Sequence, residues 1–215
     1  MERYFKEPFN SVSHLAAAVA AAIGLGFLLA VAPEGGARWS ALLVYGISMV
    51  LLFTASGIYH ALRVDANTER WLRKLDHSAV YLLIAGTFTP PAAVLLDGAW
   101  RWGLLAPVWL LALTGIGVKL LLAVGPRRLS TALYLLLGWI GVVPAVRLYA
   151  DLPQAVGWLL AGGLFYTFGA VVYARKRPDP WPGVVGFHGL WHLFVIGGSL
   201  CHYLLMLLYV APYPA

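Results

Sequence analysis

The chain has 215 residues, of which 61% are hydrophobic and only 11% are charged, and its mean hydropathy is +0.79. This composition lies far from that of ordinary soluble domains and excludes a soluble enzyme or a soluble binding module. The formal net charge of +6 could suggest a nucleic-acid partner. The basic residues are scattered between apolar runs and form no extended patch, so we expect no nucleic-acid binding. We interpret the chain, residues 1–215, as one all-α domain of a polytopic membrane protein.

Seven apolar runs predict seven transmembrane helices. The predicted spans are residues 12–32, 39–62, 75–96, 102–124, 129–148, 154–174 and 184–210. The first run follows basic residues, as in a signal peptide, but it is too long for one and further spans follow. Pro90 and Pro91 predict a kink in the third span. Cys201 is the only cysteine, which excludes a disulfide framework and a cysteine-based zinc site.

Lysine and arginine are distributed unevenly over the predicted loops. One side carries Arg3, Lys6, Arg63, Arg70, Arg73, Lys74, Lys119, Arg127, Arg128, Arg175, Lys176 and Arg177, and the other carries Arg38, Arg101 and Arg147. Because basic loops stay in the cytoplasm, the sequence predicts a cytoplasmic N-terminus and a C-terminus outside.

His188 and His192 open the last apolar run. Residues four apart share one face of a helix, and this spacing is that of two metal ligands. Ionisable groups inside a membrane are costly unless they are paired, hydrated or bound to a metal. The alternative is that each imidazole only hydrogen-bonds a neighbouring helix.

Further polar residues fall at the same cytoplasmic end, on two other spans. His60 and Ser56 end the second span, and Asp76 begins the third. Three imidazoles suit Zn²⁺ and leave a fourth position for water, as in a catalytic zinc site. Asp76 could then accept a proton from that water, and Ser56 could hydrogen-bond it. Alternatively, Asp76 pairs only with Lys74 or Arg73, and Ser56 bonds its own helix backbone.

Three histidines remain outside this predicted metal site. His14, at the start of the first span, either supports the metal ligands or makes a hydrogen bond at the helix start. His77 follows Asp76 directly and points about 100° away from it, so we expect it at the membrane interface. His202 lies roughly 15 Å beyond His192 along a helix. We therefore expect it to make a buried hydrogen bond between helices and not to bind the same metal.

These residues form three motifs that together resemble the hemolysin III proteins. The motifs are Ser56-Gly57-Ile58-Tyr59-His60, Leu75-Asp76-His77-Ser78 and His188-Gly189-Leu190-Trp191-His192, and the resemblance extends to Glu7, Asn10, His14 and His202. The hemolysin III proteins are the bacterial branch of the progestin and adipoQ receptor family, which includes the adiponectin receptors. The resemblance implies that zinc is bound by His60, His188 and His192, with Ser56 and Asp76 beside it, and that the protein is integral to a bacterial plasma (inner) membrane.

Three functions are compatible with this sequence. The first is a zinc-dependent hydrolase of a lipid amide or ester, because the wider superfamily includes alkaline ceramidases, and its partners would be membrane lipids, one of them the substrate. The second is a receptor-like sensor or regulator of membrane state, in which the zinc is structural. The third is a hemolysin-type pore former, but no span carries a polar stripe that would line a channel.

Overall fold

The computed structural model of the protein describes residues 5–33, 36–122 and 126–214, and all regular secondary structure in these ranges is helical. The elements are α1 (Pro8–Val31), α2 (Gly36–Ala61), α3 (Ala66–Leu95), α4 (Gly98–Leu121), α5 (Arg127–Trp139), α6 (Val142–Leu148), α7 (Pro153–Arg175), α8 (Gly186–Leu205) and the π-helical turn η1 (Met206–Val210). Within the described ranges, seven helical stretches are long and apolar enough to cross a membrane; α5 with α6 forms one, and α8 with η1 another. The predicted all-α, seven-transmembrane bundle is confirmed.

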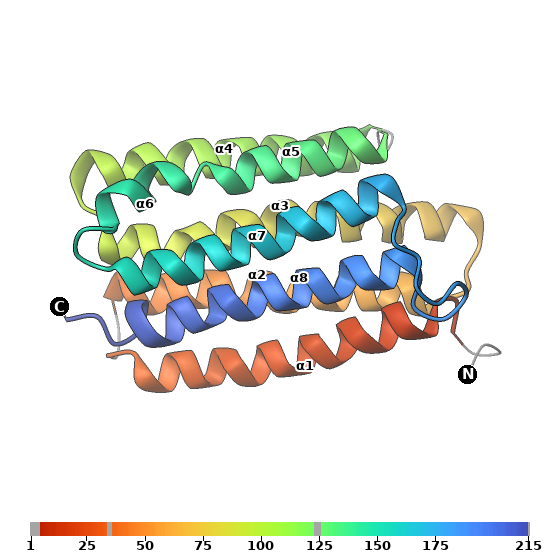
Figure 1. Cartoon of the computed structure of the whole chain (residues 1–215), viewed down its shortest axis with the longest axis horizontal. Helices are drawn as coiled ribbons and strands as arrows, with labels where there is room; N and C mark the ends of the chain where they lie inside the picture. The colour runs from red at the N-terminus through yellow and green to blue at the C-terminus, as the bar shows by residue number, and fades with distance from the viewer. Residues whose placement is uncertain (1–4, 34–35, 123–125, 215) are drawn as a thin grey trace.

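The helices lie side by side along the long axis of the molecule (Figure 1). Helices that follow one another pack together from α1 to α4, α7 packs on α8, and α8 returns to α1. Helix α5 makes lighter contacts with α3, α4 and α7. The last helix of the chain therefore lies against the first, so residues near both ends of the sequence can contribute to one site.

Helix α3 begins at Ala66, earlier than the predicted start near residue 75. Asp65 precedes it, and its carboxylate accepts hydrogen bonds from the backbone N–H groups of Asn67 (2.9 Å) and Thr68 (3.2 Å). Such a cap satisfies donors that have no partner inside the helix. Hydrogen bonds from Thr68 and Asn67 lower the pKa of Asp65, so the cap is a carboxylate. The hydropathy pattern missed residues 66–74 because most of them are polar or charged.

The predicted span 129–148 is not one continuous helix. Helix α5 ends at Trp139 and α6 begins at Val142, and Gly141 between them bonds the carbonyl three residues back instead of four. Pro144 has no N–H, so the normal bond to the carbonyl four residues before it cannot form. In contrast, α3 continues through Pro90 and Pro91 to its end at Leu95.

Two clusters of buried apolar residues lie on different faces of α3. The first cluster joins α1, α2, α3, α7, α8 and η1, and its fully buried members include Leu28, Leu42 and Tyr45. The second cluster joins α3, α4 and α5, through residues such as Phe88 and Val108. Since lipid is as apolar as these side chains, close packing is what holds such helices together in a membrane.

Candidate metal centre

Three histidines from two helices meet at one end of the bundle. His60 is in the last turn of α2, and His188 and His192 are in the first turns of α8. One ring nitrogen from each lies within 4.8 Å of the other two. The ring centroids are 4.7–5.0 Å apart, with interplanar angles of 72–88°. Among the described residues, these three form the only such group of potential ligands.

Glu7 fixes the orientation of the His60 ring. Its Oε2 lies 2.8 Å from His60 Nδ1 and 2.5 Å from the amide nitrogen of Asn10. Burial alone would raise the pKa of Glu7, but the hydrogen bond and charge of His60 and the bond from Asn10 lower it to about 2. A carboxylate can only accept, so Nδ1 of His60 donates, and in the neutral ring that a metal ligand requires Nε2 keeps its lone pair. A carboxylate behind a histidine in this way is typical of metal sites.

The backbone also ties Glu7 to α2. The N–H of Glu7 donates to the carbonyl oxygen of His60 (2.9 Å), and that of Lys6 donates to the carbonyl oxygen of Ala61 (3.1 Å). The Lys6 ammonium pairs with Glu69 at 3.1 Å and lies 3.9 Å from the centre of the Tyr59 ring. The segment before α1 therefore satisfies backbone carbonyls at the end of α2, where His60 lies.

The first turn of α8 is held by a side chain from the preceding loop. The Asp179 carboxylate accepts a hydrogen bond from the backbone N–H of Phe187 at 2.7 Å. Gly189 lets α8 approach α1 closely, since a Cβ there would lie 2.8 Å from a ring carbon of Phe9 and 3.1 Å from the side-chain oxygen of Asn10. These contacts position His188 between the loop and α1.

His14 lies directly against His192. The two rings stack with centroids 3.8 Å apart, and the edge of His14 meets Phe53 at 5.1 Å. Neither ring nitrogen of His14, nor Nδ1 of His192, has a hydrogen-bond partner among the described residues. Of the two predictions for His14, the structure favours support of the metal ligands over a hydrogen bond at the helix start.

Asp76 and Ser56 lie beside the histidines on α3 and α2. Asp76 makes no ion pair within the described part of the chain, and Lys74 donates instead to the carbonyl oxygen of Leu120 at 2.7 Å. The side chains of Ser56 and Asp76 line the same cavity, and Ser56 makes no hydrogen bond to its own helix backbone within the described residues. The structure therefore does not favour the alternatives of a surface ion pair for Asp76 and a backbone bond for Ser56. Asp76 is not part of the three-histidine group.

A cavity of about 250 Å³ extends from these residues along the bundle. Ser56, Asp76, His188 and His192 line its polar end. Its lining residues come from α1, α2, α3, α5, α6, α7 and α8, and most of them are apolar. Trp139 also lines it, and its side chain is 36% exposed. The candidate metal centre therefore adjoins an apolar cavity deep enough to hold part of a lipid.

His77 and His202 lie elsewhere on the cavity wall. His77 is half-buried, and its backbone carbonyl accepts a hydrogen bond from Tyr134 at 2.9 Å. It lines the cavity, and its Nδ1 is buried without a hydrogen-bond partner among the described residues. His202 has the predicted contact between helices, with Nε2 3.3 Å from the carbonyl oxygen of Leu159.

The residues present fit a bound metal ion. Zinc–nitrogen bonds of about 2.0–2.1 Å in a tetrahedral site bring ligand nitrogens to about 3.4 Å from one another, within the observed limit. His60 turns its free nitrogen away from Glu7, and His192 has a buried nitrogen without a partner. Three imidazoles without a thiolate suit Zn²⁺ and other borderline divalent ions.

The fold and site define a class, namely seven-helix membrane proteins with a three-histidine group that could hold a metal ion. The sequence model of the family described as "Haemolysin-III related" matches residues 2–203. The chain belongs to this family and is an integral bacterial membrane protein.

Individual relatives agree with this assignment. "Hemolysin-3" of Bacillus cereus is 36% identical over 216 residues, covering 99% of this chain and 95% of that protein. "Hemolysin-3 homolog" of Bacillus subtilis (strain 168) is 34% identical over 212 residues, covering 97% and 96%. "Adiponectin receptor protein" of Drosophila melanogaster is 27% identical over 231 residues, covering 94% of this chain and 50% of that protein. The resemblance to hemolysin III proteins and to adiponectin receptors is thus confirmed.

Proposed function

We propose that the protein is a zinc-dependent hydrolase of a lipid amide or ester. The observation that carries this proposal is the three-histidine group beside a largely apolar cavity, with His188, His192 and Asp76 among the residues that line it. A purely structural metal would need neither an adjoining cavity nor a free carboxylate. Membrane lipids would be its partners, and one of them its substrate.

Each residue near the histidines has a role in this proposal. When bound, zinc would act as a Lewis acid and lower the pKa of a coordinated water. His60, His188 and His192 would hold the ion, and Glu7 would keep the Nε2 of His60 directed to it. The Asp76 carboxylate would accept a proton from the attacking water and return it to the leaving amine or alcohol. The Ser56 hydroxyl would orient that carboxylate.

The cavity supports a lipid as the substrate. Its apolar wall would hold an acyl chain, and its polar end would hold the amide or ester next to Asp76. An apolar pocket with a few convergent polar groups is the usual form of a small-molecule site. Trp139 lines the cavity and is partly exposed, so a chain would enter from the membrane beside it.

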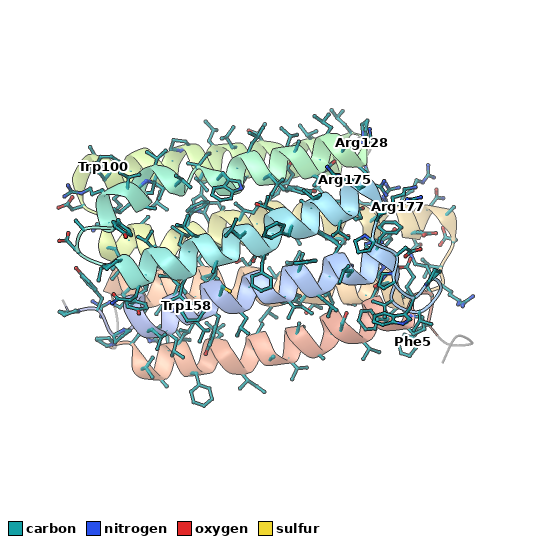
Figure 2. The ribbon with its side chains drawn as sticks, viewed as in Figure 1. Phe5, Trp100, Arg128, Trp158, Arg175 and Arg177 are labelled. Carbon is teal, nitrogen blue, oxygen red and sulfur yellow. The ribbon has the colours of Figure 1, made fainter. Side chains whose placement is uncertain are left out.

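We also propose that the metal centre lies on the cytoplasmic side. Figure 2 places Arg128, Arg175 and Arg177 at the end of the bundle where α1 begins, with Trp100 near the opposite end. This distribution follows the positive-inside rule. Reporter fusions at Ala215 test it: a reporter that is active only outside supports the orientation, and one that is active only in the cytoplasm overturns it.

The activity is tested with purified protein in detergent and a panel of long-chain ceramides, acyl amides and acyl esters. We expect release of free fatty acid by the wild-type protein and none by His60→Ala. If zinc-loaded wild-type protein hydrolyses nothing in the panel, the alternative gains support. In that alternative, the metal is structural and the protein senses or regulates the state of the membrane.

A further inference from the structure

His202, on α8, is a deeply buried histidine that the proposed metal chemistry does not use. Its side chain is 94% buried, since only 6% of its surface is exposed. Nε2 lies 3.3 Å from the carbonyl oxygen of Leu159 on α7, and because a carbonyl only accepts, Nε2 must carry the hydrogen. In the neutral ring Nδ1 is then an acceptor. It is buried and has no donor among the described residues.

Helix α7 has a glycine, Gly162, where the His202 ring packs against it. A Cβ at Gly162 would lie 2.3 Å from Nε2 of His202, so any larger residue would displace the imidazole. A buried polar atom without a partner costs about 1–3 kcal/mol. Polar residues at this depth in a membrane protein are functional candidates by default. An acceptor retained in this setting points to a donor that the protein itself does not supply.

His202 belongs to a second polar level of the cavity, formed by Thr87, Tyr166 and His202 from three helices. All three line the same cavity as the metal-site histidines. The Tyr166 ring centroid lies 5.5 Å from that of His202, and its hydroxyl bonds Ser199 at 3.0 Å. Between this level and that of Asp76, His77 and His192, the lining residues of α3 and α8 are apolar, namely Val80, Leu83, Ile84 and Val195.

The second polar level lies at a definite distance from the first. His202 follows His192 by ten residues on one continuous helix, which is roughly 15 Å along the axis. Thr87 follows Asp76 by eleven residues on α3, which is roughly 16 Å. Two helices therefore give similar separations, and the cavity is polar at two depths with apolar side chains between them.

We propose that the lipid held in this cavity carries a hydroxyl group in the middle of its acyl chain, which donates a hydrogen bond to Nδ1 of His202. An extended chain advances roughly 1.2 Å per bond, which places the hydroxyl near the twelfth carbon from the metal centre. The inference rests on the proposed function, because it assigns a substrate class to that site. A hydroxylated fatty acid would then be the product of hydrolysis.

Binding of fatty acids tests the inference without any turnover. The zinc-loaded full-length protein in detergent is titrated with 12-hydroxystearate, 2-hydroxystearate and stearate, each displacing a fluorescent fatty acid. We expect 12-hydroxystearate to bind about 2- to 10-fold more tightly than stearate, as one net hydrogen bond predicts. The 2-hydroxy isomer should gain no such advantage through His202.

Two substitutions separate the acceptor from the helix contact. In His202→Gln, the amide can still donate to Leu159 at the position of Nε2, but nothing replaces Nδ1. This variant should therefore bind 12-hydroxystearate and stearate with equal affinity. In His202→Asn, the side-chain oxygen takes the position of Nδ1, so the preference should persist. Equal binding of stearate and 12-hydroxystearate by the wild type, or an unchanged preference in His202→Gln, overturns the inference. If the fluorescent fatty acid itself does not bind, the lipid cavity of the proposed function fails as well.

Discussion

The two halves of the bundle on either side of α3 differ in what they contribute. The half made by α1, α2 and α8 packs closely and carries every histidine of the metal centre, together with Glu7 and His14. The half made by α4, α5 and α6 contributes no ligand; α5 contacts its neighbours lightly, and α5 and α6 line the cavity. The comparison teaches that α8 both carries metal-site histidines and lines the cavity, whereas α5 and α6 line the cavity without contributing a ligand. Substitutions on α5 should therefore change the cavity without changing the metal centre.

The largest effect is expected for removal of two ligands at once. His188→Ala/His192→Ala leaves one imidazole of the three, so the protein should lose its zinc. Metal analysis of the purified double variant checks this, with His77→Ala as a matched histidine substitution on the cavity wall. Full zinc occupancy in the double variant would show that the metal is bound elsewhere.

Asp76→Asn should reduce hydrolysis without removing the zinc. The amide keeps the size of the side chain but cannot accept the proton, so zinc should remain while hydrolysis falls by roughly 10²- to 10⁴-fold. Ser56→Ala should have a smaller effect of the same kind. Zinc content and fatty-acid release are measured on the same sample. Loss of zinc would make Asp76 a ligand, and full activity would remove it from the mechanism.

Glu7→Gln should weaken the metal centre without abolishing it. The amide cannot hold the His60 ring as a carboxylate does, and loss of such a supporting group typically costs about 10- to 100-fold in metal affinity. Competition with a chelator measures this. Glu69→Gln, which breaks only the ion pair with Lys6, is the control and should retain wild-type affinity. If Glu7→Gln and Glu69→Gln bind zinc with equal affinity, Glu7 does not support the metal centre.

Leu135→Trp tests the half made by α4, α5 and α6, because Leu135 lies on α5 and a larger side chain there would fill part of the cavity. Zinc affinity should be unchanged because α5 carries no ligand. Lipid turnover should fall by about tenfold, the scale of a small change in an apolar pocket. The two quantities are measured by chelator competition and by fatty-acid release. A loss of zinc together with turnover would contradict the division between the two halves.

The smallest effect is expected at His14, whose ring stacks on His192. His14→Ala should lower zinc affinity by roughly 2- to 10-fold, the range of an aromatic contact, whereas His14→Phe keeps a flat ring and should restore most of it. The spectrum of the cobalt-substituted protein would report any change in ligand geometry. If His14→Phe loses as much zinc affinity as His14→Ala, the ring nitrogens of His14 are important and the stacking is not.

Much of the fold and the three ligands could be predicted from the sequence. Long apolar runs define helices that cross a membrane, and spacing places His188 and His192 on one face, at the depth of His60. The contact between Glu7 and His60 could not be derived because it joins residues 53 apart in the sequence, through packing that hydropathy does not encode. The break between α5 and α6 was missed because Pro144 and Gly141 lie in an otherwise uniform apolar run.

The cavity was the main feature beyond sequence reasoning. Its wall combines apolar side chains of several helices, and nothing in their spacing distinguishes a lining residue from one that packs against a neighbour. His77 illustrates the limit: its position next to Asp76 suggested that it points away from the site, yet it also lines the cavity. Ligand types can be predicted from a sequence more readily than the space beside them.

The most direct test is a crystal structure of the wild-type protein with anomalous data collected at the zinc edge. The account predicts one peak between His60, His188 and His192, with no fourth protein ligand and with lipid density in the adjoining cavity. A peak at another position would contradict the metal centre. A fourth protein ligand that closes the coordination sphere would contradict the proposed hydrolase and leave the zinc with a structural role.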